Sequence, residues 1–571
     1  MNDIRRTILW VIFGFSMVLL WDQWQVHNGN KTTFFPSMSP VVQAPEPGLT
    51  APAGAPTAAH QGTAAVPGQP MPVATPPAPV AHELVEVTTD VYRLRFDNEG
   101  GALVYAELRK YADMADKSKG FVLLDQSPAR VYVAQSGLIG GVAGNTYPTH
   151  KTMMHVVPGP RTLPDGENEL NIRFESPDLG GLKLVKTWTI KRSTYDMAVR
   201  HEVLNTGSTA ASPQLYLQLV RDGNKPPGES SFYSTFTGPA VYTDEKKYHK
   251  VEFKDIKNKK FDIPPQANNG YIAMVQHYFA TAWLLPNGMP RELHMEAADL
   301  GLPTPDCCYR VQMITPLGSI APGASKAVEA HLFAGPEIEK TLEALAPGLE
   351  LVKDYGWLTI LAKPLYWLLD KLQSFIGNWG WSIVALVLLL KAAFYWLNAK
   401  AYASMAKMKA VNPKIVEMRE RLKGQPQQMQ QEMMRIYREE KVNPMGGCFP
   451  IMIQIPVFIA LYWVLLSSVE MRNAPWILWI HDLSSKDPFY ILPVLMTLTT
   501  LLQTALNPAP PDPLQAKMMW IMPLAFSVMF FAFPAGLVLY WITNNVLSIA
   551  QQSIINTRMG VPLQFNLPKF K

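Results

Sequence analysis

Hydrophobic and polar residues alternate through the middle of the chain and separate into long apolar runs towards its end. Between Glu83 and about Gly335, short segments such as Tyr92-Arg-Leu-Arg-Phe96 place apolar side chains at every second position, and Gly, Pro, Asn and Asp recur between the segments. This period of two predicts β-strands with one buried face. We therefore expect a large antiparallel β-sandwich over residues 83–340.

Five apolar runs follow, each close to the roughly twenty residues that a helix needs to cross a bilayer. Their predicted bounds are 378–398, 448–469, 489–507, 518–534 and 535–556, with loops at 470–488 and 508–517. A connecting segment, 341–377, precedes them. Within it, the mixture of Trp, Leu, Ile and Lys from Trp357 to Phe375 predicts an amphipathic helix in the membrane interface, with a core helix of the β domain as the alternative.

The first 25 residues predict one further span. Arg5 and Arg6 precede an uncharged run from Thr7 to Trp21, and no small-residue cleavage signal follows it. We interpret residues 1–25 as an uncleaved signal anchor, which brings the predicted number of transmembrane helices to six. Residues 26–82 are dominated by Pro, Ala, Gly, Gln and Thr and predict a disordered linker.

The distribution of Lys and Arg predicts the orientation of these spans. Ten Lys and Arg residues lie between Lys400 and Lys441, whereas the segment from Glu470 to Asp487 is nearly balanced in charge. Basic loops stay on the cytoplasmic side of bacterial inner membranes. Both termini, including the tail 557–571, are therefore expected in the cytoplasm, and the β domain is expected in the periplasm.

The basic segment 399–447 predicts a helical hairpin. Asn412-Pro413 is typical of a helix start, Lys423-Gly424 of a stop, and Pro426 of a second start. Methionines at helical spacing suggest an adaptable docking surface for another protein. The alternative is a solvated loop that only contacts anionic lipid. The predicted docking residues are Met405, Met408, Lys414, Met418, Arg419, Arg421, Met429 and Met433.

Lys391 is the only charged residue inside any of the long apolar runs. A lone cation in hydrocarbon costs roughly 2.5–3.5 kcal/mol, so it either extends to the membrane surface or has a function at that depth. Gln454, Thr543 and Asn544 also lie in apolar runs. Such groups either bond neighbouring helices together or line a hydrated cavity that attracts acidic segments, and the pattern leaves both alternatives open.

Several classes of protein are excluded or disfavoured. The histidines and acids of the β region, such as His201, Glu202 and Asp222, have no spacing typical of a catalytic or metal site, so we expect no enzyme, no catalytic residue, no metal and no cofactor. The spans contain no acid and no repeated halves, which disfavours an ion-coupled transporter. The net charge of +5 does not indicate direct binding of nucleic acid.

Several motifs resemble the YidC/Oxa/Alb insertase family. They include Lys441-Val-Asn-Pro-Met-Gly-Gly-Cys-Phe-Pro450, Gln454-Ile-Pro456 and Phe533-Pro-Ala-Gly-Leu-Val-Leu-Tyr540. The match is close from Asn378 to Gln552, and the anchor, linker and β region resemble the Gram-negative form, whose periplasmic domain is a β-supersandwich. The resemblance implies an inner-membrane insertase and chaperone without bond chemistry. Such a protein inserts and folds newly made membrane proteins, alone or with the Sec translocon.

The resemblance also implies a hydrophilic groove, formed by five core helices and open to the cytoplasm and to lipid. Lys391 occupies the position of the family's groove arginine, which keeps the charge but replaces a bidentate fork with a point charge. Val387 stands where the family has a threonine, so that side of the groove is expected to be drier. The predicted groove residues are Lys391, Gln454, Pro456, Tyr540, Trp541, Thr543 and Asn544.

Partners follow from the same resemblance. They are nascent membrane proteins, membrane lipids, the Sec translocon including SecD/SecF, and the ribosome or a targeting receptor at the basic hairpin. The alternative function is a membrane-anchored periplasmic protein whose sandwich binds a carbohydrate or peptide.

Overall fold

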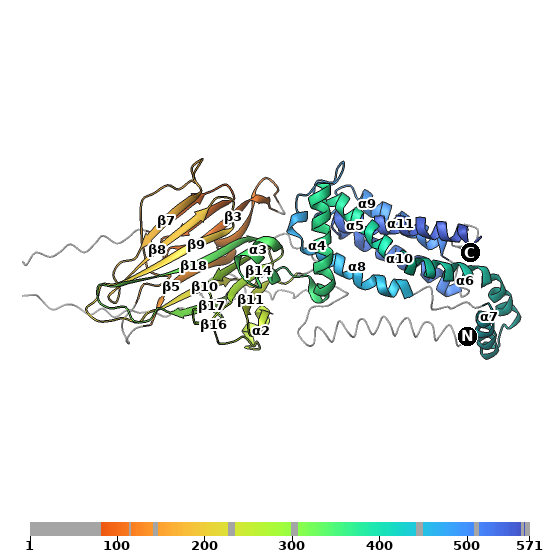
Figure 1. Ribbon diagram of the computed structural model, residues 1–571, viewed down its shortest axis with the longest axis horizontal. Helices are drawn as coiled ribbons and strands as arrows, with labels where there is room; N and C mark the ends of the chain where they lie inside the picture. The colour runs from red at the N-terminus through yellow and green to blue at the C-terminus, as the bar shows by residue number, and fades with distance from the viewer. Residues whose placement is uncertain are drawn as a thin grey trace, which may run out of the picture. The chain divides into compact units, whose positions relative to one another are not determined.

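The computed structural model describes residues 82–113, 116–140, 147–226, 235–298, 307–440, 449–507, 513–560 and 565. The predicted anchor 1–25 and nearly all of the predicted linker 26–82 lie outside these residues. So do residues 441–447 of the predicted hairpin, Cys448 at the start of the next predicted span, residues 508–512, and most of the predicted tail. The described residues form a β domain followed by a helical part (Figure 1).

The β domain consists of two nine-stranded antiparallel sheets, which confirms the predicted sandwich. The first sheet has the order β1-β2-β3-β4-β5-β10-β17-β16-β13. Its strands are β1 (Leu84–Thr88), β2 (Tyr92–Asp97), β3 (Ala102–Ala112), β4 (Gly120–Ser127), β5 (Arg130–Ile139), β10 (Gln214–Arg221), β13 (Gln266–Ala267), β16 (Arg291–Ala297) and β17 (Tyr309–Pro316).

The second sheet has the order β12-β11-β14-β15-β18-β9-β8-β7-β6. In Figure 1, β8, β9 and β18 of this sheet lie side by side. Its strands are β6 (His155–Val156), β7 (Glu169–Glu175), β8 (Leu182–Lys191), β9 (Asp196–Asn205), β11 (Gly238–Thr243), β12 (Lys247–Lys250), β14 (Tyr271–Gln276), β15 (Phe279–Leu284) and β18 (Ser325–Pro336). A short helix, α2 (Phe253–Lys257), lies between β12 and β13.

Aromatic side chains from both sheets fill the space between them. Phe96 of the first sheet lies 5.0 Å, between ring centroids, from Trp188 of the second, and Trp188 lies 6.0 Å from Trp283. Both indole N–H groups donate to backbone carbonyls of the first sheet or its turns, those of Gly101 and Gln218. These buried indoles therefore keep a hydrogen-bond partner while their rings bury a large apolar area. The alternating sequence pattern places these rings on the inner faces.

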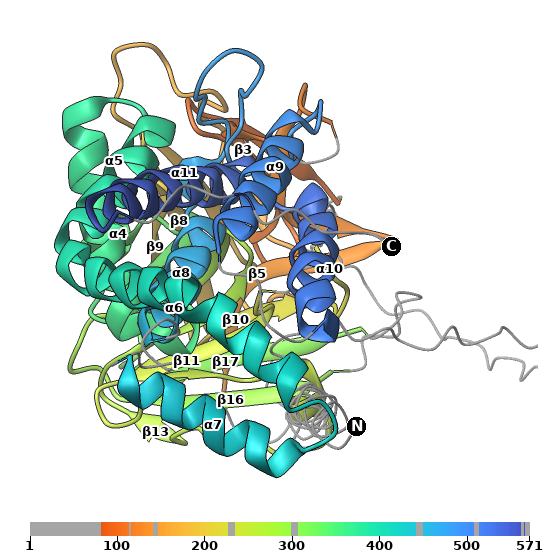
Figure 2. The same ribbon diagram turned by 90° about the vertical axis from the view of Figure 1, so that its right-hand side faces the viewer.

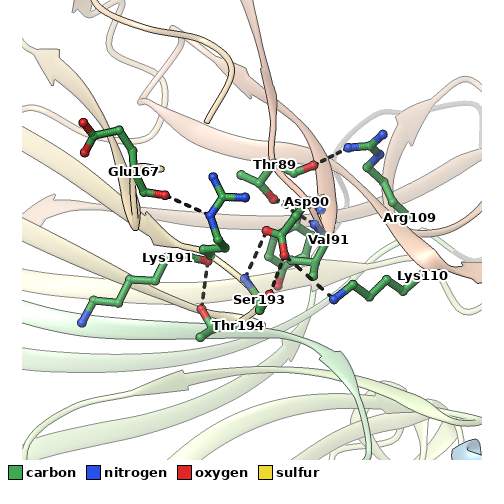
Figure 3. A network of polar contacts seen from close by, with 11 residues as sticks. Thr89, Asp90, Val91, Arg109, Lys110, Glu167, Lys191, Ser193 and Thr194 are labelled. Atoms are coloured by element: carbon green, nitrogen blue, oxygen red, sulfur yellow. Dashed lines mark hydrogen bonds and ion pairs between the residues drawn. The ribbon is translucent and has the colours of Figure 1, made fainter. Parts of the chain in front are cut away.

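One end of the sandwich is fastened by a polar network between turns (Figure 3). Asp90, between β1 and β2, accepts hydrogen bonds from the backbone N–H of Ser193 at 3.1 Å and from its hydroxyl at 2.7 Å. Ser193 lies between β8 and β9, so this carboxylate joins the two sheets. Lys110 of β3 places its ammonium 3.9 Å from the same carboxylate. The network ties the first sheet to the second at an exposed edge of the core.

A buried cation lies between the sheets. The Lys186 ammonium of β8 donates to the backbone carbonyls of Gly100 at 2.5 Å and Ser136 at 2.7 Å, and its side chain has no solvent exposure. Burial lowers the pKa of Lys186 to about 7. Because burial disfavours the charged form, the charged and neutral forms of Lys186 are about equally populated in the folded domain near pH 7.

This burial predicts a pH dependence of stability. Above pH 7 the folded protein releases the Lys186 proton, while the unfolded chain retains it to about pH 10.4, so the unfolded state binds more protons and stability rises with pH in that window. We expect the unfolding free energy of the wild type, minus that of Lys186→Met, to increase by up to about 1.4 kcal/mol per pH unit above pH 7. Urea unfolding of both proteins at pH 7, 8 and 9 measures it. A difference that stays flat contradicts the prediction.

The helical part contains eight α-helices among the described residues, and Figure 2 shows α11 between α5 and α9. They are α4 (Thr359–Ile376), α5 (Trp379–Ala393), α6 (Tyr395–Arg421), α7 (Pro426–Glu439), α8 (Phe449–Ser467), α9 (Ile491–Leu506), α10 (Pro513–Met529) and α11 (Ala535–Arg558), and a further short helix, α3 (Glu339–Leu345), adjoins the β domain. Short 3-10 turns lie at Leu349–Val352, Gly356–Leu358, Val469–Met471 and Phe530–Ala532.

Within the part of the chain that the structure describes, no single helix is long and apolar enough to cross a bilayer. The bent pair α5 and α6, with 69° between the two helices, is long and apolar enough only when the two helices are taken together.

Two sequence-based expectations about helix boundaries are wrong. The run predicted as one helix over 378–398 is broken at Phe394, where α5 ends and the chain turns into α6. The predicted helix start at Asn412-Pro413 does not occur, because α6 continues through Pro413 to Arg421. A proline inside a helix removes one backbone hydrogen bond, and the packing of α6 against α7 and α11 compensates for that loss here. The second start, at Pro426, is confirmed.

Candidate functional site

A pocket opens between α5, α6, α8 and α11. Its empty space, which includes the part open to solvent, is about 440 Å³. Five of the ten lining side chains are apolar, and the other five carry a polar group that can bond a guest. The lining residues are Val387, Leu390, Lys391, Phe394, Leu397, Asn398, Gln454, Val457, Tyr540 and Asn544.

Lys391 supplies the positive charge of this pocket. It lies in the last turn of α5, two residues before the helix ends at Ala393, and its side chain turns towards α11. The ammonium donates to the Ser548 hydroxyl at 2.7 Å. The carbonyl end of a helix favours a cation, so both the helix terminus and the serine stabilise the charge at this position. The ammonium is thus bonded to α11 within the helical part.

Gln454 of α8 and Asn544 of α11 form the second polar contact at the pocket. The Gln454 amide N–H donates to the Asn544 side-chain carbonyl at 2.8 Å. Both residues also line the pocket. The helix-to-helix hydrogen bond, one of the two alternatives for such residues, is therefore present, and the same pair lines the pocket.

Other polar residues of α11 bond to a different neighbour. The Asn545 amide donates to the hydroxyls of Thr499 at 3.2 Å and Thr500 at 2.8 Å, both on α9. Asn545 is buried, and the Thr543 hydroxyl bonds only to the backbone carbonyl of Leu539 within its own helix. The Asn545 hydrogen bonds hold α11 against α9 on the side away from the pocket.

The predicted groove residues divide into two groups. Lys391, Gln454, Tyr540 and Asn544 meet at the pocket, whereas Pro456, Trp541 and Thr543 are not among its lining residues. Trp541 packs against Phe458 of α8 and Phe530, with ring centroids 4.7 and 4.9 Å away. Val387, the expected drier position, lines the pocket and is buried.

Sequence reasoning missed Ser548, Asn398 and Phe394. A signal for Ser548 was present: Asn544, Ser548 and Gln552 recur every four residues and so share one face of α11. No comparable signal marks Phe394, because neither glycine nor proline accompanies the end of α5.

The hairpin methionines are placed differently from the prediction of an exposed docking surface. Met418 is buried with Val411 and Ile415, and partly buried side chains of both helices pack around them. These surrounding residues are Met408, Leu422, Met429, Met433, Ile436 and Tyr437. The methionines named in that prediction, apart from partly buried Met405, therefore form the small core between α6 and α7, because the same helical spacing suits a partner helix within the chain.

The basic residues of the hairpin remain on its surface. Lys414 bonds to Glu440 and Arg421 lies 3.5 Å from Glu432, with 63% and 66% of the two basic side chains exposed. Exposed ion pairs of this kind contribute little to stability and exchange readily with other partners. Arg419 is partly buried.

Comparisons with known proteins give the family. The profile of the YidC periplasmic domain matches residues 84–368, and that of the 60Kd inner membrane protein family matches residues 371–561. The membrane protein insertase YidC of Cupriavidus necator is 54% identical over 566 residues, covering 98% of each chain. The comparisons do not support the alternative of a membrane-anchored carbohydrate- or peptide-binding protein.

Two solved structures are similar at lower identity. The crystal structure of an active YidC insertase is 17% identical, with a TM-score of 0.37, and covers 82% of this chain and 92% of its own. A protein from Escherichia coli described as an aldose 1-epimerase is 10% identical, with a TM-score of 0.27, and covers 45% of this chain and 100% of its own. At these scores neither likeness carries an argument about activity.

Proposed function

The chain belongs to the YidC family of membrane protein insertases, and on this premise we propose that the pocket beside Lys391 receives the hydrophilic part of a substrate while the substrate's apolar segment enters lipid. One observation carries the proposal: a cation, an amide pair and a tyrosine converge on an open pocket in an otherwise apolar set of helices. A polar pocket at this position is expensive unless a polar guest uses it.

The physical basis is that the pocket shortens the distance over which the hydrophilic tail must cross hydrocarbon without water. A hydrophilic tail that crosses pure hydrocarbon loses all of its hydrogen bonds with water, at several kcal/mol for each unsatisfied group. Lys391, Gln454 and Asn544 offer replacement partners part of the way across. Burial of the substrate's apolar segment, at about 25 cal/mol for each Å² removed from water, then drives insertion without ATP. No bond is made or broken, and no cofactor takes part in this mechanism.

We place the chain in the membrane as a protein with six spans, five of which form the helical core that contains the pocket. Both termini then lie in the cytoplasm and the β domain lies in the periplasm. The support is the charge distribution of the sequence, in which the basic residues between Lys400 and Lys441 contrast with the balanced segment from Glu470 to Asp487. The pocket then opens near the cytoplasmic hairpin, where α6 begins after Phe394.

We infer the partners from the exposed surfaces of the hairpin, the β domain and the helices. The exposed basic residues of the hairpin, Lys414 and Arg421 among them, favour contact with a ribosome or a targeting receptor. The β domain is the proposed contact with the Sec translocon, including SecD/SecF. Membrane lipids surround the helices.

Site-specific crosslinking tests the proposal. A photoreactive residue at position 454 should crosslink to the hydrophilic tail of a ribosome-stalled single-span substrate, because Gln454 lines the pocket. The same residue at Ile521 of α10, an exposed position outside the pocket, is the control and should give few crosslinks to the tail. Equal crosslinking at both positions, or none at position 454, would contradict the proposal.

A further inference from the structure

Ser548 is the contact through which α11 meets Lys391. Its hydroxyl accepts from the Lys391 ammonium at 2.7 Å and donates to the backbone carbonyl of Asn544 at 2.7 Å. A hydroxyl has one proton and two lone pairs. Because the proton is directed to Asn544, the lone pairs remain to accept hydrogen bonds, one of them from the Lys391 ammonium, and the Tyr402 side chain is also hydrogen-bonded to this hydroxyl.

The partner of this cation is neutral. Among the described residues, no carboxylate lies within 4.0 Å of the Lys391 ammonium, and Ser548 is its hydrogen-bond partner. A carboxylate at this position would have cancelled the charge. A hydroxyl fixes the ammonium in place and leaves its net charge available to a guest in the pocket.

The Lys391 side chain has an alternative, outward conformation. Its flexible stem can carry the ammonium outward to the membrane surface, which is the usual behaviour of lysines near the ends of membrane helices. Ser548 is 2% exposed, so a bond to it keeps the ammonium on the inner side of α5. A lysine, unlike arginine, presents a compact charge that a single acceptor can orient.

Ser548 is also linked to the second polar contact of the pocket. The Asn544 backbone carbonyl accepts from Ser548, and the Asn544 side chain accepts from Gln454. One turn of α11 therefore sets the positions of both Lys391 on α5 and Gln454 on α8.

We propose that Ser548 is a positioning residue, which holds the Lys391 ammonium at the pocket as an uncompensated charge and thereby gives the site its preference for substrates with acidic tails. The inference rests on the proposed function, and it adds the residue that sets the charge specificity of that site. Ser548 itself does not need to touch the substrate.

Paired substitutions in the full-length protein test the proposal. Thr and Val have nearly the same shape, and only Thr keeps the hydroxyl. We expect Ser548→Val and Ser548→Ala to lower the insertion of an acidic-tailed single-span substrate into proteoliposomes by about tenfold, the factor expected from losing one hydrogen bond to a charged group. Insertion of the same substrate with a neutral tail should be unchanged, and Ser548→Thr should behave as the wild type.

The control is Ser527→Ala on α10. Ser527 is likewise buried and donates to the backbone carbonyl four residues earlier, that of Pro523, but it does not contact Lys391. Ser527→Ala should not lower the insertion of the acidic-tailed substrate more than the insertion of the neutral-tailed substrate. An equal loss for acidic and neutral tails in Ser548→Val would show a structural role only and would overturn the proposal, as would normal insertion of the acidic substrate by both Ser548→Val and Ser548→Ala.

Lys391→Glu, measured on the same two substrates, distinguishes a failure of the positioning role of Ser548 from a failure of the proposed function. If Lys391→Glu blocks the acidic substrate and the Ser548 variants do not, the positioning role is wrong and the proposed function stands. If Lys391→Glu also inserts the acidic substrate normally, the proposed function itself fails.

Discussion

Replacing Lys391 by glutamate is expected to lower the insertion of single-span substrates with acidic tails by tenfold or more. The substitution reverses the only charge among the described residues that line the pocket. Two unit charges about 4 Å apart near a protein surface interact by roughly 4 kcal/mol, and a change of about 1.4 kcal/mol in a barrier already corresponds to tenfold. Insertion into reconstituted vesicles, followed by protease protection of the translocated tail, measures the effect.

Two further variants test whether the positive charge of Lys391 is the cause of this effect on insertion. Lys391→Arg keeps the positive charge and should retain insertion, because attraction of an acidic tail needs a charge rather than a particular donor geometry. Lys391→Ala should lie between the wild type and Lys391→Glu. Normal insertion by both Lys391→Glu and Lys391→Ala would mean that the pocket does not attract the substrate electrostatically.

Replacing Lys353 by methionine is expected to reduce the unfolding free energy by about 3–5 kcal/mol, the cost of leaving one member of a buried ion pair without its partner. The Lys353 side chain is completely buried, and its ammonium lies 3.3 and 3.2 Å from the two carboxylate oxygens of Glu470. The Tyr366 hydroxyl of α4 donates to the same carboxylate at 2.6 Å. Removing Lys353 leaves this carboxylate with one donor in a mostly buried position. Denaturant titration in detergent measures the loss.

A matched control is available in the same region. Lys363 lies 3.6 Å from Glu350, but 35% of its side chain is exposed, so Lys363→Met should cost no more than about 1 kcal/mol. The double variant Lys353→Met/Glu470→Met should recover much of the loss, because it removes the unpaired charge. A cost for Lys353→Met as small as that of Lys363→Met would contradict the role assigned to the buried pair.

The sandwich was accessible from the sequence because strand alternation is a local property. Tyr92-Arg-Leu-Arg-Phe96 shows its buried face without knowledge of the rest of the chain, and β2 places Tyr92, Leu94 and Phe96 in the core. The pairing of nine strands in each sheet is set by contacts between distant segments, such as β9 with β18. Those contacts leave no local pattern.

The site was accessible only in part. Lys391 and Gln454 stood out because polar residues are rare in apolar runs, and both line the pocket. The end of α5 at Phe394 arises from tertiary packing and has no local helix breaker. The methionine period at Met408 and Met418 predicted an apolar face correctly, but a period cannot tell whether that face meets another protein or the neighbouring helix.

The most direct test of the account is the access of water to the pocket. In a variant with Cys307, Cys308 and Cys448 replaced by serine, Gln454→Cys can be labelled with a membrane-impermeant maleimide in inside-out vesicles. Maleimides react with the thiolate, which forms only where water or a nearby charge supports it. The control is Leu498→Cys on the exposed outer face of α9, a position that is 58% exposed and outside the pocket. The account predicts that Gln454→Cys reacts much faster than Leu498→Cys and is protected by a stalled acidic-tailed substrate. If both cysteines were equally unreactive, the pocket would be dry and the account would be contradicted.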